Sequence, residues 1–149
     1  MNKEYLNVIV ADHDEGNLVC FKDILKDLKI EVKIQMFWSG TELMGYLKNK
    51  NNIIPEVLFM AYNLAEKNAV ECLEEIKSDE RFNNMVNVFY SDHFSDLEMD
   101  EIFVKGANVC LKRPDEYKAF KKVLTEVITV NWQYHTSGMN KDNFIMKVG

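Results

Sequence analysis

Apolar residues fall along the chain in short runs that alternate with longer amphipathic stretches. The first run, residues 5–11 (YLNVIVA), is rich in β-branched side chains and ends at a polar loop, which is typical of a strand buried on both faces. From Glu15 to Leu28, apolar residues instead recur every three or four positions, which predicts an amphipathic helix. The chain therefore begins with a strand followed by a helix.

The same order of strand and helix recurs four more times. Further strands are predicted over Glu31–Phe37, Val57–Met60, Met85–Tyr90 and Asn108–Leu111. The helix after the second strand is predicted to have Thr41 as its N-cap and to extend past Leu47. The later helices are predicted over Ala69–Lys77, over Phe94–Lys105 and from Glu116 to about Asn131. Strands that alternate with helices form parallel sheets with right-handed crossovers and with helices on both faces. We therefore expect an α/β three-layer sandwich around a five-stranded parallel sheet.

The composition narrows the range of functions. The 149 residues, 47% of them hydrophobic, suit one folded domain, and six glycines and two prolines argue against long disordered segments. A formal charge of −6 disfavours broad binding to nucleic acid phosphates. No apolar stretch approaches the ~20 residues of a membrane helix, and the apolar run near the N-terminus lacks the flanks of a signal peptide. We therefore expect a cytoplasmic protein that binds neither nucleic acid nor membranes.

The sequence motifs of common catalytic and metal sites are missing. Cys20, Cys72 and Cys110 are odd in number and far apart, without CxxC or Cys–His spacing, so they predict reduced, buried thiols. There is also no Gly-rich phosphate loop, no HExxH motif and no arrangement typical of nucleophilic hydrolases. The sequence therefore does not indicate an enzyme.

The candidate functional residues lie where the predicted strands end. In open parallel sheets, ligands and chemistry are found at the carboxyl ends of the strands. In this chain these ends carry Asp12 and His13 after the first strand, Ala61 after the third, Ser91 after the fourth and Arg113 after the fifth.

Five segments resemble, in order and in spacing, the receiver domain of bacterial response regulators. They read VIVADHDEGN, SGTELMGYLK, IIPEVLFMAYNL, ECLEEIKSDERFNNMVNVFYS and KGANVCLKRP. The resemblance runs from residue 5 to residue 130 and implies a flavodoxin-like (βα)5 fold with strand order 2-1-3-4-5. It divides the chain into a receiver-like domain, residues 1–131, and a C-terminal tail, residues 132–149. Because the tail leaves no room for an output domain, the chain is most similar to stand-alone receivers, which signal by protein contact.

The resemblance also implies a phosphoryl-transfer site, but its central residues are replaced. In receivers, an aspartate at the end of the third strand accepts a phosphoryl group from a histidine kinase and helps to bind magnesium. Here that position is Ala61, whose methyl group can neither attack phosphorus nor bind a metal. The acidic pair at the end of the first strand reads Asp12-His13, so Asp12 is the one remaining candidate metal ligand. We therefore predict no metal and no other cofactor, although the family implies magnesium.

The other receiver positions are partly retained. Ser91 stands where the family has a Ser or Thr, Arg113 replaces the usual lysine, and Cys110 replaces the aromatic switch residue. Together these changes indicate a pseudo-receiver that acts without being phosphorylated. By resemblance, it would belong to a two-component, or phosphorelay, signal transduction system. An ion pair between Asp12 and Arg113 is predicted to take the place of the metal.

Simpler interpretations stay open for single residues. A loop histidine such as His13 is more often solvated than metal-bound, and a strand cysteine such as Cys110 is more often a small apolar residue than a redox sensor. Ser91 is more often a residue that satisfies loop backbone than a modification site. Tyr62 either stacks on a ligand or fills the space left by the missing aspartate.

The predicted partners are a sensor histidine kinase, another receiver or another signalling protein. The resemblance points to the surface of the fourth helix, fifth strand and fifth helix, through which a homodimer is one option. Phe94, Leu97 and Ile102 are the apolar residues there whose exposure we expect to matter.

Two alternative functions and the role of the tail stay open. The chain is alternatively a receiver phosphorylated at a non-standard residue, such as His13, Glu66 or Ser91, or a pseudo-receiver that binds a small ligand at the strand ends. In the tail, Trp132 and Tyr134 are expected to anchor the chain to the domain. Residues 143–148 are an edge strand, a partner-binding peptide or an ordered tail.

Overall fold

The elements of the chain follow the predicted alternation of strand and helix. The computed structural model describes residues 5–137 and 146–148. In chain order, with η1 a 3₁₀ helix, the elements are β1 (Leu6–Ala11), α1 (Glu15–Lys26), β2 (Val32–Phe37), α2 (Gly40–Lys48), β3 (Val57–Ala61), α3 (Ala69–Lys77), η1 (Glu80–Phe82), β4 (Val86–Ser91), α4 (Asp96–Val104), β5 (Val109–Lys112), α5 (Tyr117–Ser137) and β6 (Met146–Val148).

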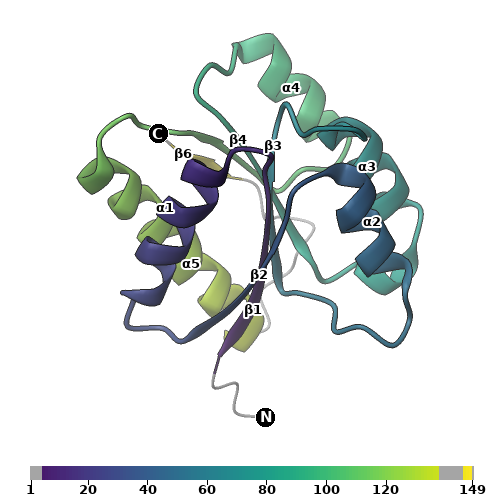
Figure 1. Cartoon of the computed structure of the whole chain (residues 1–149), viewed down its shortest axis with the longest axis horizontal. Helices are drawn as coiled ribbons and strands as arrows, with labels where there is room; N and C mark the ends of the chain where they lie inside the picture. Colours follow the sequence, from purple (N-terminus) through teal and green to yellow (C-terminus); the bar gives the residue numbers. More distant parts are fainter. Residues whose placement is uncertain (1–4, 138–145, 149) are drawn as a thin grey trace.

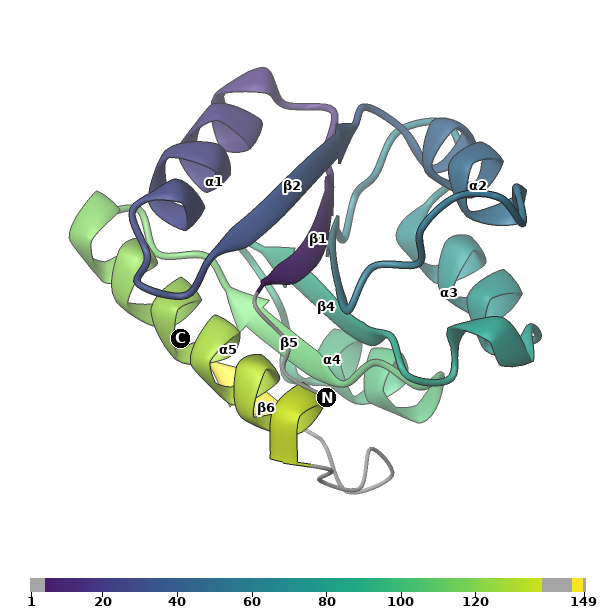
Figure 2. The same cartoon turned by 90° about the horizontal axis from the view of Figure 1, so that it is seen from below.

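The strands form one parallel sheet in the order β2-β1-β3-β4-β5-β6. The first five confirm the predicted flavodoxin-like order 2-1-3-4-5, in which the chain starts near the middle and winds to both sides (Figure 1). Residues 146–148 add a sixth strand beside β5, which agrees with the edge strand named as one option for residues 143–148 (Figure 2). In the part of the chain that the structure describes, each helix is too short or too polar to cross a membrane.

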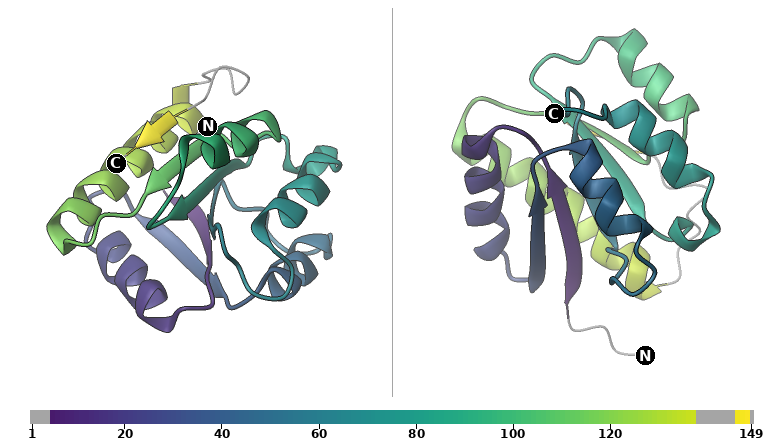
Figure 3. Two further views of the ribbon diagram at one scale, coloured as in Figure 1. Left: turned by 90° about the horizontal axis from the view of Figure 1, so that it is seen from above. Right: turned by 45° about the vertical axis from the view of Figure 1, so that its right-hand side comes forward.

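Two apolar clusters, one on each face of the sheet, make up the core. Alternate residues of each strand point to opposite faces, so Val8 and Val10 contribute to one cluster and Ile9 and Ala11 to the other. Helices α1 and α5 cover the first face, and α2, α3 and α4 cover the second (Figures 1 and 3). This arrangement confirms the predicted three-layer sandwich and brings the carboxyl ends of the strands to one edge.

Short polar side chains start four of the helices. Asp14, Ser39, Asn68 and Ser95 each accept a hydrogen bond from the backbone N–H three residues further on, which satisfies a donor that the helix leaves free. Ser39 rather than Thr41 is therefore the N-cap of α2, because the helix already begins at Gly40. At α4 a capping box fixes the start at Asp96, two residues after the predicted start.

Helix α5 is longer than predicted and runs without a break through residue 131. Asn131 is fully buried and donates to the carbonyl oxygen of Val127, so a polar residue continues the helix instead of ending it. Beyond it, Tyr134 is buried in the α1–α5 cluster and Trp132 packs against that cluster. The aromatic pair assigned to the tail thus belongs to the domain's last helix. Of the tail segment 143–148, residues 143–145 lie outside the described residues.

Candidate functional site at the strand ends

A cleft of about 190 Å³ lies where β1, β3, β4 and β5 end, and we call it the strand-end cleft. Parallel pairing sets its geometry, since Ala61 is in register with Tyr90 and Ser91 with Lys112. The residues that line it are Asp12, His13, Asp14, Asn17, Ala61, Asn63, Tyr90, Ser91, Asp92, His93 and Arg113. The fold therefore brings together the five strand-end residues singled out in the sequence.

Asp12 is buried, and its carboxylate accepts three hydrogen bonds. Its Oδ2 accepts from the Tyr90 hydroxyl at 2.7 Å and from the Asn17 side-chain amide at 3.0 Å. Its Oδ1 accepts from the backbone N–H of Asp14 at 2.9 Å. A buried charge is tolerated only when such partners replace water. Asp12 therefore has the environment of a structural carboxylate.

Tyr90 is the residue of this site that sequence reasoning missed. Its ring packs against Phe21 on α1, with centroids 4.9 Å apart, and Phe21 also contacts Phe59 and Phe120 at 5.3 and 5.1 Å. Burial, and then the negative charge of Asp12, raises the pKa of Tyr90 well above its ordinary value, so the hydroxyl stays a donor. The sequence signal was a tyrosine at the end of a buried strand, because a buried phenol needs a hydrogen-bond partner.

The Tyr90 hydroxyl reaches Asp12 across the end of β3. Strand β3 lies between β1 and β4, and at its end Ala61 is paired in register with Tyr90. Ala61 presents only a methyl group, which leaves the path between the phenol and the carboxylate open. The small side chain of Ala61 is thus coupled in space to the Tyr90–Asp12 hydrogen bond.

The predicted ion pair between Asp12 and Arg113 was wrong. Arg113 Nη1 lies 3.5 Å from Asp92 Oδ1, and the guanidinium stacks over the Phe120 ring, 5.0 Å from its centroid. Asp12 is instead satisfied by neutral donors from β4 and α1. Since the arginine packs towards α5 and pairs with a loop aspartate, it belongs to the outer wall of the cleft.

Ser91 and His13 have modest local roles. The Ser91 hydroxyl oxygen accepts from the backbone N–H of His93 at 3.2 Å, a contact that orders the loop after β4. His13 Nδ1 lies 3.8 Å from Asp12 Oδ1, and about half of its side chain is exposed.

Tyr62 does not occupy the space beside Ala61, and it does not line the strand-end cleft. Its ring packs edge-on against Phe94, with centroids 5.2 Å apart. Burial, and then the charges of Glu98 and Glu101, raises the pKa of Tyr62. Tyr62 therefore joins the end of β3 to the segment before α4 and does not fill the space left by the missing aspartate, whereas stacking on a ligand stays a prediction.

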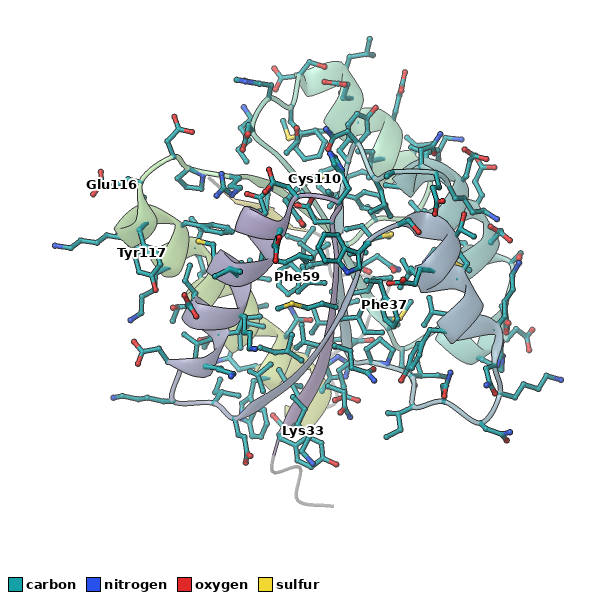
Figure 4. The ribbon with its side chains drawn as sticks, in the orientation of Figure 1. Lys33, Phe37, Phe59, Cys110, Glu116 and Tyr117 are labelled. Atoms are coloured by element: carbon teal, nitrogen blue, oxygen red, sulfur yellow. The ribbon has the colours of Figure 1, made fainter. Side chains whose placement is uncertain are left out.

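The three thiols lie away from the cleft. Cys110 is fully buried in the α2–α3–α4 cluster, and Figure 4 shows it in the interior, whereas Tyr117 lies at the surface. Cys72 is also buried, and burial raises the pKa of its thiol to about 11. Cys20 is only partly buried, contrary to expectation. No thiol of the described residues is placed to react in the cleft.

The side chains at the strand ends do not fit magnesium. Magnesium requires near-octahedral oxygen ligands and usually carboxylates. Here Asp12 accepts three hydrogen bonds, and His13 and Ala61 offer no oxygen. Among the residues that the structure describes, no three acidic, histidine or cysteine side chains are grouped as metal ligands.

Outside the cleft, α4 exposes apolar side chains. Leu97 is 70% exposed and Val104 is 87% exposed, and their spacing of two helical turns places them on one face. Phe94 and Ile102, the other expected candidates, are buried. Val104 was not among the predicted residues, because in the sequence it follows the apolar residues Ile102 and Phe103 at the end of the helix.

Comparisons with known proteins agree with this architecture. Neither models of known protein families nor curated protein sequences match the chain. Solved structures do match it. The phosphorylated cyanobacterial phytochrome response regulator RcpA has a TM-score of 0.78 at 16% identity, over 91% of this chain and 97% of that chain. The Mn²⁺-bound response regulator Rcp1 gives 0.76 at 16% identity, over 83% of this chain and 92% of that one. The chemotaxis response regulator CheY4 of Vibrio cholerae has a TM-score of 0.68 at 16% identity, over 83% of this chain and 98% of that chain.

The fold and its strand-end cleft define a flavodoxin-like α/β protein. Within that class, the chain has the fold of response regulator receiver domains.

Proposed function

We propose that this chain is a receiver-like module of two-component signalling that acts through protein contacts and accepts no phosphoryl group. The observation that carries the proposal is Ala61, which lies in the strand-end cleft at the end of β3. Phosphoryl transfer to protein requires a nucleophilic side chain at the attacking position. A methyl group supplies none, and Tyr62 beside it is directed towards Phe94.

The engagement of Asp12 supports the same proposal. A cation at the cleft would compete with the hydrogen bonds of a buried carboxylate, and the side chains of His13 and Ala61 offer no oxygen. Rcp1 has been solved in a Mn²⁺-bound form. We propose that this chain lacks that property and needs no metal.

The outer face of α4 is the proposed contact surface. Leu97 and Val104 are exposed there, and Asp96, Asp100 and Glu101 surround them with negative charge. Exposed apolar side chains rimmed by charge are typical of protein contact sites. A sensor kinase or another signalling protein with a basic, apolar surface fits this face.

The size of the cleft argues against the small-ligand alternative. Ligand pockets usually enclose about 300–1,000 Å³, whereas this cleft has about 190 Å³. Asp12, Asp14 and Asp92 face it against the single cation of Arg113, so an anion would meet net negative charge.

The test is intact-mass spectrometry after incubation with acetyl phosphate and Mg²⁺. RcpA, treated in parallel, shows that the reagent is active. The native chain should keep its mass, whereas the triple variant His13→Asp/Ala61→Asp/Tyr90→Phe, which restores two carboxylates and frees Asp12, should gain one phosphoryl group. A native chain that gains a phosphoryl group stoichiometrically overturns the proposal, and peptide mapping would then show whether His13, Glu66 or Ser91 carries it.

A further inference from the structure

The Tyr90 side chain crosses the end of β3 on the face of the sheet to which Ala61 also points. Strand β3 lies between β1, which Asp12 directly follows, and β4, which carries Tyr90. Ala61 and Tyr90 are paired in register, and both belong to the α1–α5 cluster. Neighbouring strands lie about 4.7–4.9 Å apart, so a contact between β4 and the end of β1 spans two such spacings. The phenol, whose hydroxyl oxygen lies 2.7 Å from Asp12 Oδ2, therefore passes over the methyl group of Ala61.

This phenol takes the space that a longer side chain at position 61 would need. Tyr90 is 2% exposed, and its ring is held against Phe21 with centroids 4.9 Å apart, so it cannot turn away without opening the cluster. Ala61 is itself buried, although it lines the strand-end cleft. Tyr90, rather than Tyr62, therefore fills the space beside position 61.

The hydroxyl group also gives Asp12 a partner that makes a cation unnecessary. A buried carboxylate needs either hydrogen-bond donors or a cation to replace its water. Asp12 Oδ2 accepts from the Tyr90 hydroxyl and from the Asn17 amide, and the side chains of His13 and Ala61 bring no oxygen with which a metal could compete. Neutral donors thus stand where a divalent cation would have to bind.

We propose that Tyr90 closes the strand ends to divalent cations, because its hydroxyl group occupies both the partner position at Asp12 and the space above position 61. The inference rests on the proposed function and deepens it. It implies that the missing carboxylates are only part of the reason why the site lacks a metal. Acidic residues restored at positions 13 and 61 do not reopen the site while the Tyr90 hydroxyl remains.

The test measures Mn²⁺ binding to full-length variants by electron paramagnetic resonance, in which bound Mn²⁺ loses the sharp signal of the free ion. His13→Asp/Ala61→Asp should leave the signal as it is with the native chain. Adding Tyr90→Phe should remove the signal of one Mn²⁺ per chain, and a further Asp12→Asn should restore it. Adding Phe59→Leu to the double variant instead loosens the same cluster but keeps the hydroxyl, so no Mn²⁺ should bind.

A double-mutant cycle tests the same contact by urea unfolding and needs no metal. Ala61→Val should raise the unfolding equilibrium constant about tenfold more in the presence of Tyr90 than in Tyr90→Phe, because the added methyl groups meet the hydroxyl. This cycle decides alone if a multiple variant does not fold.

Two Mn²⁺ results overturn the proposal: a double variant that binds as tightly as the triple variant, or a triple variant that binds none. Equal effects of Ala61→Val in the two chains overturn it as well. The proposed function fails by a different result, a native chain that gains a phosphoryl group.

Discussion

Asp12 and Arg113 stand on opposite sides of the strand-end cleft and are held in different ways. Asp12 is buried beneath three short hydrogen bonds from Tyr90, Asn17 and the backbone of Asp14. The Arg113 side chain has one long ion-pair contact, to the half-exposed Asp92, and stacks over the Phe120 ring. Both are residues that the receiver resemblance singles out, yet one is part of the core and the other belongs to the rim. Two charged residues at the same edge of the sheet can thus serve different purposes, with Asp12 held in the core and Arg113 at the outer wall of the cleft.

The largest expected effect comes from the aromatic residue that supports the Asp12 side. Phe21 is fully buried and contacts Phe59, Tyr90 and Phe120. Phe21→Ala should lower the free energy of unfolding by about 3–5 kcal/mol, because it leaves a cavity beneath the cleft. Urea unfolding measures it, with Val19→Ala on the exposed face of the same helix as control, where the change should stay within about 0.5 kcal/mol. Equal effects at the two positions would show that the cluster does not support the site.

A smaller effect is expected when only the hydroxyl on the Asp12 side is removed. Tyr90→Phe keeps the ring and deletes the hydrogen bond to a buried carboxylate, so it should cost about 1.5–3 kcal/mol. The measurement is again urea unfolding at neutral pH. A change near zero would mean that Asp12 finds another donor and that Tyr90 is not what holds it.

Alkaline pH should weaken that same hydrogen bond. The pKa of Tyr90 is raised in the folded chain, mainly by burial and then by Asp12, from an ordinary value of 10.0. A raised pKa means that the stabilisation is complete below pH 10.0 and declines as the pH rises further. The stability gap between the native chain and Tyr90→Phe should therefore stay constant up to about pH 10 and shrink as the pH rises above that value. Tyr62 is common to both proteins and cancels, so a gap that stays constant would exclude Tyr90 as the titrating group.

The smallest effect is expected on the Arg113 side. Arg113→Ala removes a long ion pair with the half-exposed Asp92 and a stacking contact with Phe120, so it should lower the free energy of unfolding by about 1 kcal/mol or less. The comparison between the two sides fails if this substitution destabilises the chain as much as Tyr90→Phe does in the same unfolding experiment.

Most of the fold follows from the sequence because hydrophobic periodicity repeats five times along it. The sixth strand was one of three options for the tail, since three residues carry no period and a parallel partner far away in the chain decides their conformation. Helix α5 was expected to end at Asn131, because a buried polar residue in a helix is recognised only when its bond to Val127 is known.

The position of the candidate site could be predicted, but the hydrogen bonds between its side chains could not. The strand ends follow from topology, and with them Asp12, Ala61, Ser91 and Arg113. The donor that binds Asp12 must have a side chain long enough to reach it across the strand between them. The spacing of residues in the sequence does not reveal this distance. A tyrosine from β4 has that length, and the small Ala61 on β3 leaves it room.

Strand ends that carry Ala61 and a hydrogen-bonded Asp12 should hold neither a phosphoryl group nor the metal that accompanies it. Beryllofluoride with Mg²⁺ imitates a phosphoryl group on a carboxylate, so backbone amide NMR spectra recorded with and without it read each strand end directly. The amide signals of Asp12, Ala61 and Ser91 should stay where they are. Saturable shifts at these three residues would contradict the account.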